Sequence, residues 1–356
     1  MDLNQVYNAQ TIAANQTEAG SNRIPYLGEG LFPARKKMGL DLKWIRSHKG
    51  LPVSLAPSNF DAKSTLRSRE GIKVDETQMA FFRESVLVKE EDEQSIMRVA
   101  DTNDPYLADV LNSVYDDAGA LVEGARVVAE RMRMQLLAPT TDGSPRITIE
   151  SGGVQYSYNY DVDGSYKTNN YKAISTASAK WSDTDNSDPL SDIMEAQDSV
   201  EANTGSRPSI MICSKKTMGY LRNNAKVQKA ILAQNTTANV LMTDNVVKSV
   251  IQSILGIAVI VYTKQYKDED GNASKFYPDD YVTLLPDGAL GSTWYGTTPE
   301  ERTLIGRPET DVSVVDTGIT VTVTVTNDPV NTKTTVSEIV LPSYERMDET
   351  YVIKVA

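Results

Sequence analysis

Residues 104–138, DPYLADVLNSVYDDAGALVEGARVVAERMRMQLLA, hold the longest periodic pattern in the 356-residue chain. Their apolar residues recur at spacings of three and four, which predicts the buried stripe of an α-helix. Asp104 is placed to cap the helix, Pro105 stands in its first turn and Pro139 follows its end. At about 1.5 Å per residue the helix is roughly 50 Å long. Its period is nearer to 3.6 than to a strict heptad, so we expect a spine that crosses a large sheet. The stripe comprises Leu107, Val110, Leu111, Val114, Ala118, Leu121, Val122, Ala125, Ala129, Met132 and Leu136.

The chain before this helix shows no comparable pattern. Residues 1–49 scatter glycines and prolines between short apolar stretches, so we expect an extended N-terminal arm. Residues 51–89 have apolar residues at both ends of a charged centre, which predicts a long hairpin. The middle of that hairpin, 60–77, is too charged for a core and too long for a routine turn, and we expect it to project as a loop.

The chain after the helix changes character twice. Residues 146–171 predict β-structure with turns at Gly152-Gly153 and Asp163-Gly164, and the polar run 175–188 predicts a linker. An α/β alternation follows: helix 189–203, strand 208–213, helix 215–234, helix 244–255 and strand 257–263.

Two apolar strands in the C-terminal half carry specific expectations. The sequence GIAVIVY at 256–262 is continuously apolar, as in strands that are buried on both faces. From Ile319 the alternating Thr and Val residues predict one strand of a hairpin with a polar face. An exposed edge of that kind would aggregate, so we expect it to be covered or paired with another subunit. A last strand is predicted in ETYVIKVA, 349–356.

The chain offers little for catalysis. Cys213 is its only cysteine and His48 its only histidine, which excludes an intramolecular disulfide or a cysteine-based zinc site. His48 lies in a basic, glycine-flanked stretch (RSHKG) unlike the surroundings of a general base. No Walker loop, dinucleotide fingerprint, GxSxG elbow or HExxH motif is present. We predict no catalytic, cofactor-binding or metal residues, and therefore no enzyme.

One acidic segment, DTDNSD at 183–188, is similar to the start of a calcium-binding loop. Its sixth position is not glycine, and its twelfth is Met194 where a bidentate glutamate is required. We therefore interpret the segment as a solvated linker.

The net charge of −12 is unevenly distributed. Residues 1–89 carry +4, which leaves −16 for the remainder of the chain. Because affinity for nucleic acid comes largely from neutralising phosphates, the acidic body predicts no specific DNA binding. No apolar run reaches the roughly 18 residues of a membrane span, and the first residues lack the features of a signal peptide. We expect a protein that is made in the cytoplasm and contacts no membrane.

Several short stretches, taken in order, resemble the lambda-type major capsid proteins of tailed bacteriophages, the major capsid protein E family. In the projecting loop, LRSREG at 66–71 is similar to the family's arginine-serine-arginine-glycine turn. Trp181-Ser182, Asp188-Pro189 and Asp192-Ile193 resemble the entry to its axial domain. The strand, turn and later elements that resemble the family are Ile257 to Tyr262, Tyr266, Gly271, Phe276, Pro278, Asp279, Tyr295-Gly296 and the closing VIKVA.

The resemblance implies an α+β, Hong Kong 97-like phage capsid fold. Its segments are an N-terminal arm at 1–49, an extended loop at 50–93, a peripheral domain at 94–186 with the spine helix 104–138, an axial domain at 187–308, and return strands of the peripheral domain at 309–356. It implies a major capsid protein that self-assembles into hexamers and pentamers of an icosahedral shell, with a scaffolding protein, a portal and, optionally, a decoration protein as partners.

The resemblance also implies where copies of the chain touch. The basic arm and loop would meet acidic surfaces of other copies, and the candidate contact residues are Arg67, Arg69, Lys73, Arg35, Lys36 and Lys37. The shell would enclose DNA in the virion after assembly in the host cytoplasm. No loop lysine can be matched to a crosslinking asparagine, so we expect noncovalent assembly.

Two other structural proteins remain as alternatives. An encapsulin-like nanocompartment shell shares the fold but would close into uniform particles without a helper protein. A tail or baseplate protein would form tubes or rings.

Overall fold

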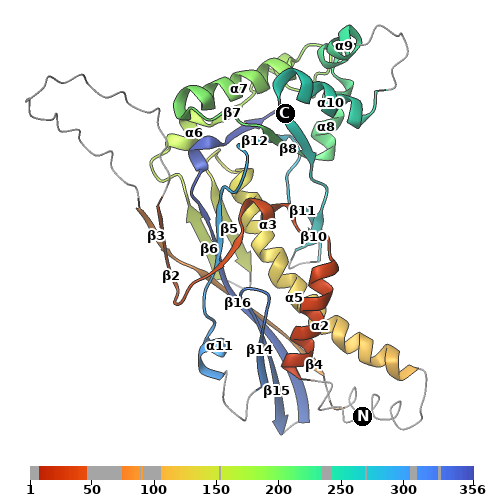
Figure 1. Cartoon of the computed structure of the whole chain (residues 1–356), viewed down its shortest axis with the longest axis vertical. Coiled ribbons are helices and arrows are strands. Elements are labelled where there is room, and N and C mark those ends of the chain that lie inside the picture. Colours follow the sequence, from red (N-terminus) through yellow and green to blue (C-terminus); the bar gives the residue numbers. More distant parts are fainter. Residues whose placement is uncertain are drawn as a thin grey trace, which may run out of the picture. The chain divides into compact units, whose positions relative to one another are not determined.

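A computed structural model describes residues 8–45, 74–88, 90, 106–151, 154–234, 242–268, 271–304, 311–327 and 330–356. The chain divides into two compact units, each assembled from separate stretches of sequence (Figure 1). The first unit comprises Met1–Lys43, Glu76–Met132 and Ser292–Ser343, and the second comprises Trp44–Asp75, Arg133–Gly291 and Tyr344–Ala356. The segments expected from the sequence divide the chain at other boundaries than these two units. Those boundaries remain a prediction.

The long helix predicted for 104–138 is present as α5, Tyr106–Leu137. Of the predicted stripe, Ala118, Leu121, Val122, Ala129, Met132 and Leu136 are buried. The helix also buries charged side chains on its other faces, which a single apolar stripe does not predict. Arg126, Glu130 and Arg133 are all less than a tenth exposed.

The first unit is built on a six-stranded sheet with the order β1-β13-β16-β15-β14, in which β4 also pairs with β16. These strands are β1 (Ala34–Lys36), β4 (Ala80–Val88), β13 (Gly291–Tyr295), β14 (Asp311–Val315), β15 (Ile319–Asn327) and β16 (Val330–Tyr344). The Thr and Val strand β15 is antiparallel to both β14 and β16. Over Thr320–Val323 both edges of β15 are therefore covered within its own chain, whereas Thr324–Asn327 pair with β16 alone among the described strands.

The extended arm predicted for 1–49 is wrong over its first half, because α2 (Ala9–Asn22) is a helix. Ala9, Ile12 and Ala13 are buried against α5, β14 and β15. The Asn8 carboxamide accepts a hydrogen bond from the Thr11 backbone N–H at 2.7 Å and so caps the helix. This helix gains its stability from tertiary packing, so its sequence shows only a weak helical pattern. The helix α3 (Leu27–Leu31) and the short helix α11 (Pro299–Leu304) complete the unit.

The loop predicted at 60–77 lies mostly outside the described residues. Its last residues belong to β3 (Val74–Gln78), which pairs with β2 (Asp41–Ile45). The next strand, β4, pairs with β16 across Val88–Ala80 and Thr332–Val340. The described end of the predicted 51–89 hairpin is thus paired with strands from outside that segment.

The second unit contains a five-stranded sheet with the order β7-β17-β12-β8-β9. Its strands are β7 (Tyr171–Ala173), β8 (Ile210–Cys213), β9 (Ala258–Val261), β12 (Tyr281–Leu285) and β17 (Tyr351–Lys354). The helices α7 (Pro189–Thr204), α8 (Lys215–Asn223), α9 (Ala225–Gln234) and α10 (Asp244–Leu255) belong to the same unit. Smaller elements are β5 (Arg146–Ser151), β6 (Val154–Asn159), α6 (Ser165–Asn169), η1 (Ala177–Ala179), β10 (Gln265–Lys267), β11 (Ala273–Lys275) and η2 (Met347–Glu349).

Three sequence-based expectations in this unit are corrected by the structure. The strand expected at 257–263 to be buried on both faces is the edge strand β9, and its Ala258 is exposed. The single helix expected at 215–234 is two helices, because Asn224 leaves helical geometry and its amide binds the Thr184 and Ser187 carbonyls. The polar stretch 175–188 is not a free linker.

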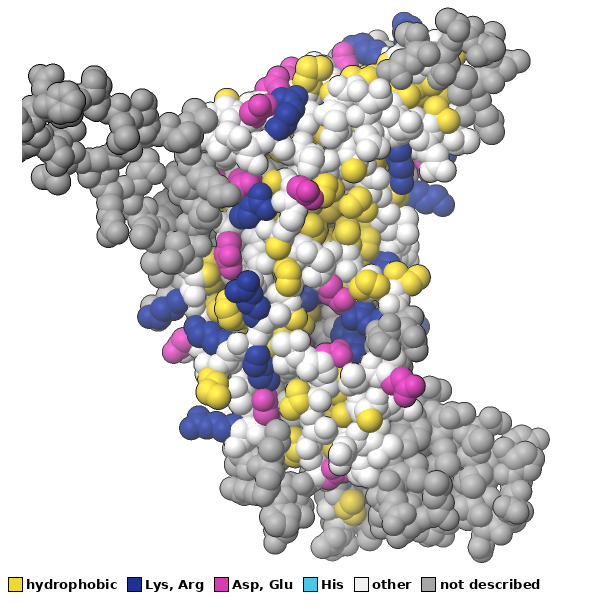
Figure 2. Space-filling model, in the orientation of Figure 1, with side chains coloured by type: hydrophobic (Ala, Val, Ile, Leu, Met, Phe, Trp, Pro, Cys, Tyr) yellow, Lys and Arg dark blue, Asp and Glu magenta, His cyan; other side chains and the backbone are white. Residues whose placement is uncertain are grey.

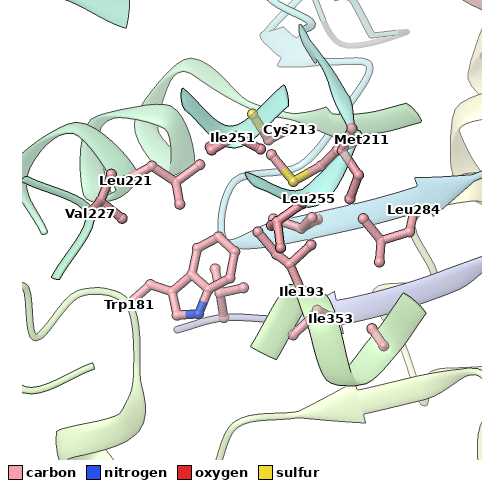
Figure 3. Packing of buried hydrophobic residues seen from close by; sticks show 14 of the residues in the cluster. Trp181, Ile193, Met211, Cys213, Leu221, Val227, Ile251, Leu255, Leu284 and Ile353 are labelled. Atoms are coloured by element: carbon pink, nitrogen blue, oxygen red, sulfur yellow. The ribbon is translucent and has the colours of Figure 1, made fainter. Parts of the chain in front are cut away.

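Trp181, in that polar stretch, is fully buried in the core of the second unit (Figure 3). Its ring lies among side chains from the helices and the sheet, including Ile193 and Leu221. Its backbone N–H donates to the Val355 carbonyl at 2.9 Å, and its indole Nε1 donates to Asp192 at 3.0 Å. A large aromatic side chain thereby fastens the stretch to the core.

Replacing Trp181 with alanine is expected to lower the free energy of unfolding by about 3–5 kcal/mol, because it opens a cavity in a closed core. Met38→Ala is the control, since Met38 is 89% exposed and should cost almost nothing. Urea unfolding followed by circular dichroism measures both. A loss below about 1 kcal/mol for Trp181→Ala would contradict the central position of this ring.

Candidate assembly surfaces

The three arm residues among the predicted contacts, Arg35, Lys36 and Lys37, lie on and just after β1; we call them the basic strand. β1 runs parallel to β13, with Arg35 opposite Trp294 and Lys36 opposite Tyr295. The Lys37 backbone N–H continues the ladder by donating to the Tyr295 carbonyl at 2.8 Å. β1 is the terminal strand of its sheet, so these basic residues stand at an edge.

The charges of the basic strand are only partly neutralised within the chain. The Lys36 ammonium is 2.6 Å from a carboxylate oxygen of Glu301. The Arg35 guanidinium lies 5.7 Å from the centre of the Trp294 ring, in a cation–π contact. Among the described residues, Arg35 and Lys37 form no ion pair. Two of the three charges are thus available to a partner.

Exposed apolar side chains directly follow the basic strand. Met38 is 89% exposed and Leu40 is also exposed, on either side of Gly39. Gly39 has a φ of +88°, which only glycine adopts readily. Basic and apolar side chains presented together on a fixed turn are typical of protein contact surfaces. Over the visible face of the molecule, charged side chains of both signs are interspersed with apolar ones (Figure 2).

The loop residues among the predicted contacts, Arg67, Arg69 and Lys73, lie outside the described residues. The structure therefore neither joins them to the basic strand nor separates them from it.

A partly buried polar network, which the sequence did not reveal, fixes the segment that leads into the basic strand. The Tyr26 hydroxyl donates to Glu123 of α5 at 2.5 Å, and the Gly28 backbone N–H donates to Glu130 at 3.1 Å. Arg126, from the same helix, contacts Asp316 at 2.6 Å. Burial, together with the Glu123 carboxylate, raises the pKa of Tyr26. The charged side of α5 thus holds the polypeptide just before β1.

The single cysteine and the aspartates of the acidic segment 183–188 have structural roles. Cys213 is buried, and burial raises the pKa of its thiol to about 12, so the thiol is protonated and unreactive at neutral pH. Asp183 accepts hydrogen bonds from Asn186 and Asp185, and Asp188 caps α7. In the described part of the chain, no group of three His, Cys, Asp or Glu residues could hold a metal ion. His48 lies outside the described residues. No described helix is long and apolar enough to cross a membrane.

The model of one protein family, phage major capsid protein E, matches residues 9–355 of this chain. The chain belongs to the phage major capsid protein E family. Among curated proteins no match is found for this capsid protein.

Solved structures that are similar to this chain share its fold. A phage-related protein from Bordetella bronchiseptica RB50 aligns with a TM-score of 0.58 at 14% identity, over 96% of this chain and 97% of the other. A prophage protein from Escherichia coli CFT073 gives a TM-score of 0.52 at 17% identity, over 80% of each chain. The capsid of cyanophage A-1(L) gives 0.51 at 11% identity, over 92% and 91%. The capsid protein therefore has the mixed helix and sheet, Hong Kong 97-like fold expected from its sequence.

Family membership identifies the general role of the protein. Major capsid proteins are structural proteins of the phage particle, so this chain self-assembles into shell oligomers and resides in the virion. The functional sites of such a protein are the surfaces on which copies meet.

Replacing Tyr26 with phenylalanine is expected to lower the free energy of unfolding of the capsid protein by about 1 kcal/mol, since the ring stays and only the hydrogen bond to Glu123 is lost. The hydroxyl donates only when protonated. Because its folded-state pKa is raised, its contribution is complete below the unfolded pKa of about 10 and disappears as pH rises through the folded pKa. Urea unfolding at pH 7 measures the difference.

The control for this variant is Tyr158→Phe, because no acceptor for the Tyr158 hydroxyl is found in the described parts of the chain. Equal losses for the two variants, or none for Tyr26→Phe, would show that the network does not anchor the segment.

Proposed function

We propose that this capsid protein is the major head subunit of a tailed bacteriophage, whose copies form the hexamers and pentamers of an icosahedral shell around double-stranded DNA. The observation that carries the proposal is the family match over residues 9–355. It is supported by a fold in which β15 pairs with strands of its own chain, while basic and apolar side chains stay exposed on and just after the edge strand β1.

In this proposal each segment of the chain has its own role in the shell. Residues 1–49 form the N-terminal arm and 50–93 the extended loop, which lies over an adjacent subunit. Residues 94–186 and 309–356 form the peripheral domain, and 187–308 form the axial domain at the centre of each capsomer. The helix α2 and the polar network at Tyr26 give this arm a folded base from which to reach a neighbour.

The proposed partners follow from shell assembly. A scaffolding protein directs the copies, a portal ring occupies one vertex, and a decoration protein is an optional addition. The net charge of −12 supports enclosure of DNA without specific binding, because like charges repel the phosphate backbone. Assembly takes place in the bacterial host cytoplasm.

The protein acts through contacts and not through catalysis. In support, the buried Cys213 thiol is protonated at neutral pH, and the aspartates of 183–188 are engaged in turns and a helix cap. Assembly is noncovalent, so mature particles boiled in detergent should run as one monomer band.

The shell itself is tested by electron microscopy of the full chain expressed with and without the products of its neighbouring genes. Closed icosahedral shells that require the helper proteins are expected. Tubes or open rings would contradict the proposal in favour of a tail protein, and uniform closed particles from the chain alone would favour a nanocompartment shell.

The candidate contact residues Arg67, Arg69, Lys73, Arg35, Lys36 and Lys37 are tested by charge reversal. Arg67→Glu with Arg69→Glu is expected to leave a folded subunit that forms no shells, because two attractive contacts become repulsive. Arg35→Glu with Lys37→Glu should act alike, whereas Arg67→Lys with Arg69→Lys keeps the charge and serves as control. Normal particle yield from both reversed variants would rule out these contacts.

A further inference from the structure

The helices of the second unit segregate their charges by sign. Helix α7 carries four carboxylates, Asp192, Glu195, Asp198 and Glu201, and no basic residue. Helices α8 and α9 together carry five basic residues, Lys215, Lys216, Arg222, Lys226 and Lys229, and no acidic one. An ordinary solvated helix mixes the two signs, so this separation calls for a physical reason.

The two sets of charges lie on one helical layer. Helix α10 packs against α7 and also against α8 and α9 (Figure 1). Glu195, Asp198 and Glu201 are exposed along α7, and Lys226 and Lys229 are exposed along α9. We call these surfaces the acidic face and the basic face of the second unit, the latter including Lys215 and Lys216 of α8.

Ion pairs within the chain leave both faces charged. On the acidic side, Lys172 contacts Asp192 and Glu195, and Arg207 contacts Asp198 and Glu201, so two cations serve four carboxylates. On the basic side, Lys216, Arg222 and Lys226 pair with Asp280, Asp244 and Asp188. Lys215 and Lys229 have no ion pair among the described residues.

Each face also exposes one large apolar side chain. Met194 on α7 is 42% exposed and stands next to Glu195. Leu232 on α9 is 46% exposed and stands three residues after Lys229. An apolar side chain surrounded by charges of one sign matches a second surface of the opposite sign with an apolar side chain of its own.

We infer that the acidic face of one subunit binds the basic face of the next, with Met194 and Leu232 at the centre of the contact. A two-fold axis through either face would place like charges together, so a contact that uses one face of each subunit joins an acidic face to a basic face. The contact is therefore head-to-tail, and repetition of such a contact by rotation closes a ring. This inference rests on the proposed function, because it names the surfaces on which the subunits of a hexamer or pentamer meet.

The test reverses each face separately and then both together in the full chain. Glu195→Lys with Asp198→Lys reverses the acidic face, and Lys226→Glu with Lys229→Glu reverses the basic face. Either pair alone should abolish capsomers and shells, as measured by sedimentation velocity and electron microscopy under the conditions in which the wild-type chain assembles. The quadruple variant restores opposite signs and should regain assembly with copies of itself.

The matched control is Glu150→Lys with Asp185→Lys. These exposed residues belong to the same unit, and their reversal changes the net charge by as much as reversal of the acidic face. The control should assemble like the wild type. Thermal unfolding verifies that each variant is folded. Glu195→Gln with Asp198→Asn, which removes charge with little change of shape, should weaken assembly even if a lysine variant fails to fold.

The outcomes separate the inference from the proposed function. Normal assembly of the two single-face variants, or a folded quadruple variant that remains unassembled, overturns the inference and leaves the shell function standing. Failure of the wild-type chain to form shells with its helper proteins overturns the proposed function, and the inference with it.

Discussion

Burial of the apolar stripe of α5 is the constraint on which the first unit depends. A helix of 32 residues with a wide apolar face is not stable in water unless that face is covered. Around Ala118 and Val122 the cover comes from α2, near the start of the chain, and from β14 and β15, some 200 residues later. The Asp311 carboxylate accepts a hydrogen bond from the Ala9 backbone N–H at 2.5 Å, so the two covering segments also bind each other. The core therefore cannot form until remote parts of the chain meet.

The polar side of α5 imposes a second condition. Arg126 and Glu130 are buried, and buried charges are costly unless they are paired or hydrogen-bonded. Asp316 pairs with Arg126, and the Gly28 backbone N–H donates to Glu130. The Gly28 contact also holds the segment that leads into β1. The position of the exposed basic strand thus depends on contacts with α5. Residues that contact a neighbouring subunit gain affinity when they are held in place before binding.

The sequence predicted those elements whose signals are local. In the sequence an aspartate and then a proline stand at the start of the predicted long helix and of α7, and the predicted boundaries agree with the structure to within about two residues. Helix α2 was missed because its stability comes from packing on strands more than 290 positions away, as the hydrogen bond of Ala9 with Asp311 illustrates. The break at Asn224 was missed for a similar reason, since its amide binds carbonyls 37 and 40 positions earlier.

The candidate contacts could be predicted only in part. Sequence reasoning identified Arg35, Lys36 and Lys37 as basic residues of an arm, but it could not show that Glu301 neutralises Lys36 from 265 positions away. The charge separation between α7 and α8–α9 was present in the sequence as a run of acids followed by a run of bases. Its meaning depends on knowing that α10 packs against both sets of helices, which periodicity does not reveal.

The pairing of β15 within its own chain is compatible with the charged assembly surfaces that we infer. The Thr and Val strand β15 has the alternation and low charge of an aggregating edge, yet β16 pairs with it over Thr320–Asn327 and β14 covers its other side over Ile319–Val323. A subunit with that edge open would pair irreversibly and in several registers before a shell could form. Contacts between charged faces are weaker, depend on salt and discriminate strongly against wrong partners. A misplaced subunit can then leave and bind again, which a closed shell built from many equivalent contacts requires.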